Sequence, residues 1–598
     1  MRLVFLLFLL PVTQLPLVLP AQPLTYQSVH LKEPDKLISY VDSCIRFWKK
    51  SFEPVSGAFY TNVDRQGKWI SSQGGYKHLL TQSRNAYAFS RHFQMTGDTS
   101  SLRYARRALA FMTKYAWDPA YHGWIHELKE TGAPVNRFSD KTAFFQHYAL
   151  LGLMAFYEAT GDTSVLRWIR TGFASNETNF WDKTPGREGY YDVAKYNLTS
   201  PANKTFNSHL DAITTHLIGL TTQFPDSIIY KERLHDMADL AVNRFIASMP
   251  DQAIGFCEHF TSDWKQNASQ NLSIMGHVLK TAWCLARVDQ LDGTKNYLSQ
   301  AKMVADHVLD NGYDHQYGGP YKDYDRFTGT MQMWGNPDTA KAWWQMQQAV
   351  MAGLILYDLT GDMKYFEMAD ESLAFFMRYF VDHTYGEVYS DRERSGKPTW
   401  GDQKGNGYKA GYHSVELGYY SWLYASFYVH KRPIQMHVRV HSMFNPDGIR
   451  LYPAELPDDE LVIDSVVFSG TGSVTLLRES KKLIAEAGTD GVAKVFLSRS
   501  TAGTGIAERM KSFRVHPAYP NPFNPETTLP VNLAVPGMIS IDIYDILGRK
   551  IQEIGPFNGN QGLNPVRIQA GSHWASGLYI ARITSGRQSE SVRMILQR

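Results

Sequence analysis

Residues 143–169 read AFFQHYALLGLMAFYEATGDTSVLRWI, and this stretch decides the fold. Its first half places apolar residues at i, i+4, i+7 and i+11, which is one stripe of a buried helix. The stripe consists of Phe144, Tyr148, Leu151 and Ala155. It ends at Thr160-Gly161-Asp162, where the glycine can adopt the left-handed conformation after the last turn and the aspartate can cap the next helix. The stretch therefore predicts two helices joined by a tight turn.

The same turn recurs as Thr96-Gly97-Asp98 and Thr360-Gly361-Asp362, so the helical hairpin is a repeated unit. A first helix is expected over residues 35–51 and a last one from Tyr412 onward. The first helices of five hairpins are expected to start near Leu79, Ala143, Asn207, His277 and Lys341. Twelve helices, with the first pairing with the last, predict a closed (α/α)6 barrel within residues 22–432. An open solenoid is less favoured, because solenoids usually repeat at roughly 30–50 residues and these hairpins lie about 65 apart.

Both ends of the chain depart from this pattern. Arg2 is followed by an apolar run and a Pro- and Leu-rich segment, so residues 1–21 are expected to be a secretory signal peptide. After residue 432, short alternating runs predict strands, so 433–510 is expected to be a small β module or linker and 511–598 a further β-sandwich-like module. No later stretch reaches about 18 uninterrupted apolar residues, so no membrane span is expected.

Composition narrows the classes of function. Lys and Arg number 61 against 58 Asp and Glu, so no charge surplus points to nucleic acid or to an anionic membrane as the partner. Aromatic residues make up 13% of the chain, and flat rings serve both large helical cores and the recognition of sugar faces. The three cysteines, Cys44, Cys257 and Cys284, are too few and too scattered for a disulfide framework, although one pair is possible, and they suggest no zinc site.

The C-terminal segment carries a specific series of motifs. It opens with Tyr519-Pro520-Asn521-Pro522-Phe523-Asn524-Pro525, continues with IDIYDILGR at 541–549 and ends with Ser576-Gly577-Leu578-Tyr579. An ordinary adhesive β-sandwich shares the strand alternation but lacks this opening. The segment resembles the type A sorting domain of the bacterial type IX secretion system. The resemblance implies that the secretion machinery is a partner of this chain and that the protein is secreted or held at the cell surface.

Several polar residues lie near the expected starts of the first helices of each pair, which would form the inner ring of the barrel. They are Arg84, Asn207, Asp211, His277, Lys341 and His413. The N-terminal ends of the inner helices are expected to face one common mouth, where helix dipoles and converging side chains make a polar pocket lined by aromatic rings. Asn207 and Asp211 share one face of their helix, as do His277 and Lys280.

Around these residues stand short signatures in a fixed order, about one to a hairpin. They are Gln82-Ser83-Arg84 with Ala88-Phe89-Ser90-Arg91, Gly276-His277, Lys341-Ala342-Trp343-Trp344 and Lys409-Ala410-Gly411-Tyr412-His413. The series resembles the N-acylglucosamine 2-epimerase and cellobiose 2-epimerase superfamily. The resemblance implies an (α/α)6 barrel that catalyses 2-epimerisation or aldose–ketose isomerisation of a sugar through a cis-enediolate.

The resemblance also implies a role for each matching residue. His277 and His413 would remove and return the C2 proton from opposite faces, while Arg84 would stabilise the enediolate oxygen. Asn207 would orient the sugar and Trp344 would stack against it. Neither a metal ion nor an organic cofactor is implied.

Four positions depart from the superfamily pattern. Asp211 stands where members commonly place a third histidine, and Lys280 and Gln348 stand where glutamates are expected. Tyr408 replaces a tryptophan five residues before the last histidine. We expect these four residues to bind the substrate, either for the same reaction with different tuning or for another reaction.

Two other functions fit such a barrel. A glycoside hydrolase or lyase would use Asp211 as its general acid, although no second carboxylate at an inner-helix mouth has an equal claim. A non-catalytic glycan-binding protein would keep the pocket without the chemistry. All three hypotheses expect a mono- or oligosaccharide as the bound molecule. Several other histidines are expected to be structural: His92, His126, His147, His216 and His259.

Overall fold

A computed structural model provides the structure of the chain. It describes residues 24–598 except 293–296, 334, 400, 446, 452, 501–512, 516–517, 534–535, 547–548, 561 and 586–587. The signal peptide predicted at 1–21 lies outside the described residues.

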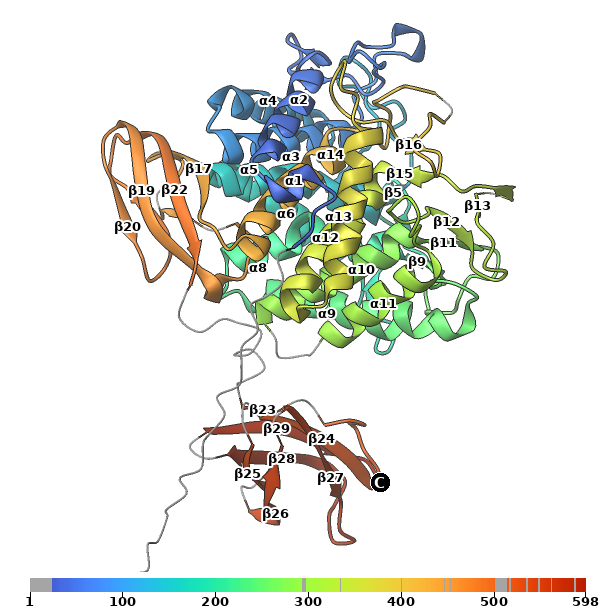
Figure 1. Ribbon diagram of the computed structural model, residues 1–598, viewed down its shortest axis with the longest axis vertical. Helices are drawn as coiled ribbons and strands as arrows, with labels where there is room; N and C mark the ends of the chain where they lie inside the picture. Colours follow the sequence, from blue (N-terminus) through green and yellow to red (C-terminus); the bar gives the residue numbers. More distant parts are fainter. Residues whose placement is uncertain are drawn as a thin grey trace, which may run out of the picture.

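The described chain contains twelve long helices that alternate between an inner and an outer ring (Figure 1). The inner ring consists of α3 (Leu79–Thr96), α5 (Ala143–Thr160), α7 (Phe206–Ala212) with its continuation α8 (Ile218–Gln223), α10 (Met275–Asp292), α12 (Trp343–Thr360) and α14 (Tyr412–Tyr424). The outer ring consists of α2 (Lys36–Lys49), α4 (Thr99–Tyr115), α6 (Thr163–Asn179), α9 (Ile228–Leu240), α11 (Leu298–Asn311) and α13 (Met363–Phe375). A single turn, α1 (Val29–Lys32), precedes them.

The inner helices form a closed ring. Each packs against the next, and α14 packs against both α3 and the first long helix, α2, so the last helix meets the first. An inner helix such as α5 is buried along almost its whole length, which explains why it is apolar on more than one face. The predicted (α/α)6 barrel is confirmed, and its inner helices begin within two residues of the predicted positions.

The glycine turns join inner to outer helices as the sequence predicts. Gly97, Gly161 and Gly361 adopt φ angles of +77°, +61° and +71°, a region that glycine enters without the steric cost of a Cβ atom. The aspartate that follows each glycine caps the next helix, as in the 2.9 Å hydrogen bond from the Ser164 amide to Asp162. The expected caps are therefore confirmed.

A buried lysine stands two positions before four of the inner helices. Each forms an ion pair of 3.0 Å with a carboxylate that follows the preceding outer helix. The pairs are Lys77–Glu53, Lys141–Asp118, Lys204–Asp182 and Lys341–Asp314. Because a buried charge is costly unless it is paired, these contacts connect the start of each of the four helices to the loop after the preceding outer helix. Lys341, one of the polar residues near the predicted mouth, has this structural position.

The segment after the barrel folds into two three-stranded sheets. They have the strand orders β17-β22-β19 and β18-β21-β20. The strands are β17 (Ile434–His441), β18 (Ile449–Arg450), β19 (Leu461–Thr471), β20 (Val474–Leu477), β21 (Lys482–Ala485) and β22 (Asp490–Arg499). We call these residues, 434–499, the middle module. They lie beside α3 and α5 in Figure 1 and belong to the same continuous hydrophobic core as the barrel.

One loop of the middle module inserts charge into the barrel. Glu455 is 2% exposed, and its carboxylate pairs with Arg91 of α3 at 2.7 Å. Arg91 also pairs with Glu158, near the end of α5, at 2.6 Å. Arg287 of α10 donates hydrogen bonds to the carbonyls of Ala454 and Leu456. The loop therefore covers the inner-ring end that lies opposite the helix N-termini.

The C-terminal segment forms two further sheets around a core of its own. Their strand orders are β23-β24-β27 and β26-β25-β28-β29. The strands are β23 (Arg514–Val515), β24 (Glu526–Leu533), β25 (Gly537–Asp545), β26 (Lys550–Gly559), β27 (Gly562–Gln569), β28 (Gly577–Ser585) and β29 (Gln588–Leu596). Alternate residues of β24 are buried, as expected for a strand with one face on a core.

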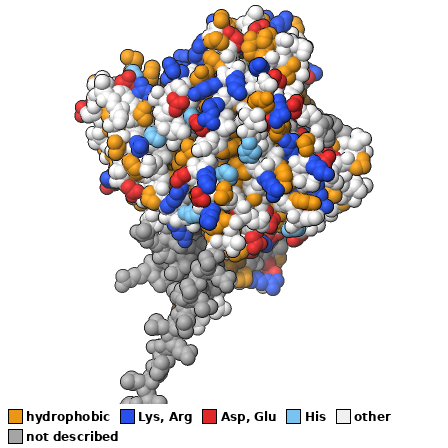
Figure 2. Space-filling model, turned by 45° about the horizontal axis from the view of Figure 1, so that its top comes forward, with side chains coloured by type: hydrophobic (Ala, Val, Ile, Leu, Met, Phe, Trp, Pro, Cys, Tyr) orange, Lys and Arg blue, Asp and Glu red, His pale blue; other side chains and the backbone are white. Residues whose placement is uncertain are grey.

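The surface agrees with the balanced composition. On the face shown in Figure 2, Lys and Arg side chains are interspersed with Asp and Glu. Cys44, Cys257 and Cys284 are free and buried. Among the described residues, no helix combines the length and apolar character that crossing a membrane requires.

Candidate active site

The polar residues selected from the sequence gather in the first two turns of the inner helices, in two layers. The outer layer holds the second or third residue of a helix: Asn207, His277, Trp344 and His413. The inner layer holds the sixth residue: Arg84, Asp211, Lys280 and Gln348. Since a helix advances 1.5 Å per residue, the layers lie about 5 Å apart in depth.

His277 is held by a carboxylate. Its Nδ1 lies 2.8 Å from Oε2 of Glu258, a residue that is 5% exposed and also accepts the Ile274 amide. The imidazole stacks on Phe206, with ring centroids 4.0 Å apart. With Nδ1 engaged, Nε2 is the nitrogen left to exchange a proton with a ligand.

His413 is held by an amide instead. Its Nδ1 lies 2.8 Å from Oε1 of Gln347, whose Nε2 donates to Glu416 at 2.6 Å. Burial, followed by the positive charges of Arg84 and Lys280, lowers the pKa of His413 well below its ordinary value. Burial raises the pKa of Glu416 to about 7. His413 is therefore a neutral imidazole at neutral pH, the form that can accept a proton.

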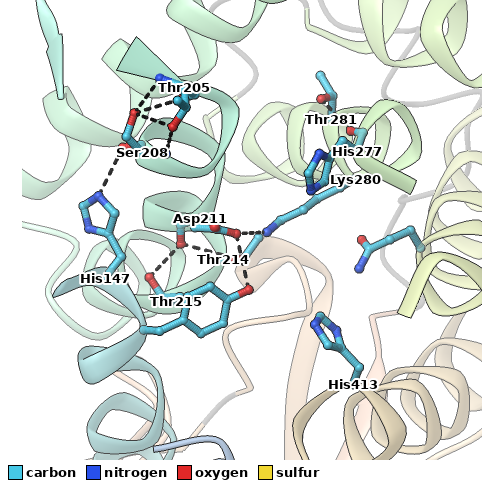
Figure 3. Close-up of polar contacts among 12 residues, drawn as sticks. His147, Thr205, Ser208, Asp211, Thr214, Thr215, His277, Lys280, Thr281 and His413 are labelled. Atoms are coloured by element: carbon cyan, nitrogen blue, oxygen red, sulfur yellow. Dashed lines mark hydrogen bonds and ion pairs between the residues drawn. The ribbon is translucent and has the colours of Figure 1, made fainter. Parts of the chain in front are cut away.

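Trp344 connects the two histidines. Its ring centroid lies 5.1 Å from that of His277 and 6.1 Å from that of His413. The two imidazoles come from α10 and α14, so the ring of Trp344 on α12 brings together three inner helices. Figure 3 shows His277 and His413 on the same side of the Asp211–Lys280 pair, with His147 beyond Asp211.

Arg84 projects from α3 between aromatic rings. Its guanidinium carbon lies 4.4 Å from the ring centroid of Tyr148 and 5.6 Å from that of Tyr412. One terminal nitrogen donates to the carbonyl of Tyr408, while Nε is buried without a hydrogen-bond partner among the described residues. A buried donor without a partner is costly, so Arg84 is held here with part of its hydrogen-bonding capacity unused.

Asp211 and Lys280 form a buried ion pair between α7 and α10 (Figure 3). The Tyr148 hydroxyl donates to the same carboxylate oxygen of Asp211, at 3.3 Å. Burial disfavours the ammonium, but the charge and hydrogen bond of Asp211, together with Tyr148 and Cys284, outweigh this effect and raise the pKa of Lys280. The other carboxylate oxygen, Oδ2, is buried without a partner among the described residues.

The remaining candidates have different surroundings. Asn207 is half-buried beside Phe206 in the outer layer. Gln348 is 2% exposed and is hydrogen-bonded to Trp283 and Gln347, so its amide is already engaged by the barrel. Tyr408 is 66% exposed, and its carbonyl rather than its ring contacts Arg84.

Sequence reasoning missed the residues that orient the histidines: Glu258, Gln347 and Glu416. Glu258 lies in a loop before α10, so helical spacing gave no signal for it. Glu416 stands three positions after His413 on the same helix, a spacing that could have found it.

The histidines expected to be structural mostly have protein partners. His92 contacts Ser101 and Asp42, His147 contacts Ser208 and Asn176, and His126 stacks on Phe145. Among the described residues, no three His, Cys, Asp or Glu side chains are grouped to hold a metal ion.

Two family models match the chain. The family described as N-acylglucosamine 2-epimerase (GlcNAc 2-epimerase) matches residues 57–416, and the secretion system C-terminal sorting domain matches residues 517–597. The second match covers the segment that resembles a type IX sorting domain, so the chain carries such a domain for export to the cell surface or beyond it.

Individual proteins agree with the first match. The chain is 20% identical to the cellobiose 2-epimerase of Bacteroides fragilis over 383 residues, which is 62% of this chain and 93% of that protein. It is 22% identical to the N-acylglucosamine 2-epimerase of Bos taurus over 390 residues, 61% of this chain and 84% of that protein.

Solved structures share the fold. The cellobiose 2-epimerase from Spirochaeta thermophila has a TM-score of 0.57 at 20% identity, covering 66% of this chain and 97% of that structure. A D-mannose isomerase has a TM-score of 0.59 at 18% identity, and the match covers 66% of this chain and 99% of that structure. The family model matches more than half of the chain, and polar residues gather at the starts of the inner helices within the matched range. This chain belongs to the N-acylglucosamine 2-epimerase family of isomerases.

Proposed function

We propose that the protein is an exported sugar 2-epimerase or aldose–ketose isomerase that works through a cis-enediolate, with His277 and His413 as its acid–base pair. The observation that carries the proposal is the shared contact of the two imidazoles with Trp344, each with its Nδ1 already engaged. Two bases beside one aromatic wall suit a flat sugar intermediate that is approached from both faces.

In the proposed reaction one histidine takes the C2 proton of the open-chain sugar through Nε2. The C–H electron pair becomes the C1–C2 double bond, and negative charge moves to the C1 oxygen. Arg84 would stabilise that oxygen, and its positive charge acts at this site because it contributes to the lowered pKa of His413. The second histidine returns a proton to the opposite face of C2, which gives the epimer. Protonation at C1 instead, with transfer of the O2 proton to O1, gives the ketose.

His413 is the better candidate for the first base at neutral pH. Its surroundings lower its pKa well below the ordinary value, so it is unprotonated before the substrate arrives. His277 has the carboxylate of Glu258 on Nδ1, which holds the ring in place and leaves Nε2 to exchange a proton with the opposite face of the sugar. Trp344 would stack on the sugar, while Asn207 and the Asp211–Lys280 pair would bind its hydroxyl groups.

The hydrolase alternative has less support. A general acid must carry a proton, whereas the carboxylate of Asp211 is engaged by the ammonium of Lys280. Glu258 is a second carboxylate in this region that the sequence did not reveal, but it is hydrogen-bonded to His277.

The test is proton NMR in D2O on the purified chain with mannose, glucose, N-acetylglucosamine, cellobiose and mannobiose in turn. The expected result is deuterium at C2 of one of them, with an epimer or ketose accumulating. Both His277→Ala and His413→Ala should abolish it. Binding of a sugar with no exchange at C2 would contradict the proposal and support a non-catalytic barrel, and release of a shorter saccharide would support the hydrolase.

A further inference from the structure

A groove of about 550 Å³ lies between α6 of the outer ring and the middle module. Its lining includes Tyr157 and Gly161, at the C-terminal end of an inner helix, so it lies at the opposite end of the barrel from the candidate active site. The volume falls in the range of about 300–1,000 Å³ that is usual for sites of small ligands.

Four basic side chains line this groove in two like-charged pairs. Arg167 and Arg170 are three residues apart on the exposed side of α6, so they are neighbours on the helix surface. Arg450 and Lys482 lie directly opposite each other in the antiparallel register of β18 and β21. Like charges in either arrangement repel. Arg450 already has Asp458 as a partner, so an anion in the groove would relieve mainly the repulsion between Arg167 and Arg170.

Nearby carboxylates neutralise this charge in part. Among the described residues that line the groove, one is acidic, Asp447. Asp458 pairs with Arg450 at 2.9 Å, but it is shared with Lys481 at 2.6 Å. The groove therefore keeps an excess of positive charge.

An aromatic pair lies beside these cations. The rings of Tyr157 and Phe224 are nearly parallel, with centroids 6.0 Å apart and an interplanar angle of 20°. The guanidinium of Arg170 lies 5.2 Å from the Phe224 centroid. A flat ring next to a guanidinium suits a ligand that presents an apolar sugar face and an acidic group.

The two walls of the groove are held together by fixed contacts. The buried Asn445 side chain donates to the carbonyl of Thr160 at 2.7 Å, and the amide of Thr163 donates to the carbonyl of Phe444 at 3.2 Å. The groove is thus shaped before a ligand arrives, which lowers the entropic cost of binding.

We infer that this groove is a second saccharide site, selective for acidic sugars whose carboxylate or sulfate is bound by Arg167, Arg170 and Lys482. It would hold a glycan at the end of the barrel away from the mouth. It does not depend on the chemistry proposed for His277 and His413.

Titration calorimetry of the full chain at low salt tests the inference, with a trigalacturonate, a sulfated disaccharide and neutral cellotriose as ligands. At least one acidic saccharide should bind more tightly than cellotriose, and added salt should weaken it. Arg167→Ala/Arg170→Ala should weaken that binding about tenfold, the loss of roughly one charge-assisted hydrogen bond. It should leave deuterium exchange at C2 unchanged.

The matched control is Arg103→Ala/Lys114→Ala, which removes the same charge from exposed positions of α4 outside the groove. Equal binding of cellotriose and the acidic saccharides would overturn the inference, as would binding of neither acidic saccharide or equal affinity in the two double variants. Inorganic sulfate is titrated as well. If it binds as tightly as the sulfated disaccharide, the groove binds anions and does not recognise the sugar, which would also overturn the inference.

Discussion

The Nδ1 atom of His277 lies 2.8 Å from Oε2 of Glu258, although nineteen residues separate them along the chain. The equivalent nitrogen of His413 meets an uncharged amide, that of Gln347. The two rings are therefore held by different acceptors: a carboxylate for His277, and for His413 an amide with the Glu416 carboxylate 3.6 Å from the same nitrogen. This asymmetry leads to the first two predictions.

Replacing Glu258 with glutamine should lower kcat at least about 10-fold while KM changes little, because an amide is a weaker acceptor for Nδ1 and holds the His277 ring less firmly. Steady-state kinetics on the sugar identified by C2 exchange measures this. The control is Glu479→Gln, which makes the same substitution at an exposed position of the middle module and should leave kcat unchanged. An unchanged kcat in Glu258→Gln would remove Glu258 from the mechanism.

Replacing Gln347 with glutamate should move the acid limb of the kcat/KM profile to higher pH. The new carboxylate favours the imidazolium of His413, whose pKa is held low in the wild type, so the free base is lost at a less acidic pH. Gln347→Leu, which brings no charge, should lower activity without that shift. An acid limb that stays in place in Gln347→Glu would show that His413 is not the base that titrates.

Replacing Lys280 with methionine should destabilise the barrel by about 3–5 kcal/mol, because it leaves the carboxylate of Asp211 buried without its partner. The double variant Asp211→Leu/Lys280→Met should recover much of this loss. Urea unfolding of the two single variants and the double variant gives the coupling free energy. Additive effects would mean that the ion pair contributes little to stability.

The middle module should be required for a stable barrel. Glu455→Ala leaves the buried Arg91 with one carboxylate fewer and should cost about 3 kcal/mol, whereas Glu486→Ala, at an exposed position of the same module, should cost little. Truncation after residue 432 should give insoluble protein. Deletion of 513–598, which has its own core, should leave the unfolding temperature of the barrel unchanged. A soluble, cooperatively folded chain ending at 432 would contradict this.

The contribution of His147 to stability should fall as the pH is lowered from 7 to 5. Burial lowers the pKa of His147 to about 4, so between pH 6.5 and 4 the unfolded chain binds a proton that the folded chain does not. This single group should account for about 2 kcal/mol of the loss at pH 5. His147→Gln should flatten the dependence, measured by urea unfolding at each pH, while the exposed His383→Gln should not. Equal slopes in the two variants would count against a neutral, buried His147.

Local patterns were sufficient to predict the barrel. Apolar periodicity and the Thr-Gly-Asp turns act over a few residues, so they locate helix starts and ends without knowledge of the rest of the chain. Because the inner helices start at one end of the ring, the same reasoning predicted one mouth for the residues near those starts, which are Arg84, Asn207, Asp211, His277, Lys341 and His413. The repeated lysine before four inner helices was present in the sequence as well, but its role depends on carboxylates in the loops before it.

The sequence by itself determined the helix order, the positions of the inner-helix residues and the sorting segment, because each rests on contacts between near neighbours or on a contiguous motif. Only the tertiary structure decided which partners orient the two histidines, that Lys280 turns toward Asp211, and that the middle module belongs to the core of the barrel. These features depend on side chains from different helices and loops that meet when the ring closes. The spacing of residues along the chain does not indicate which of these side chains come into contact.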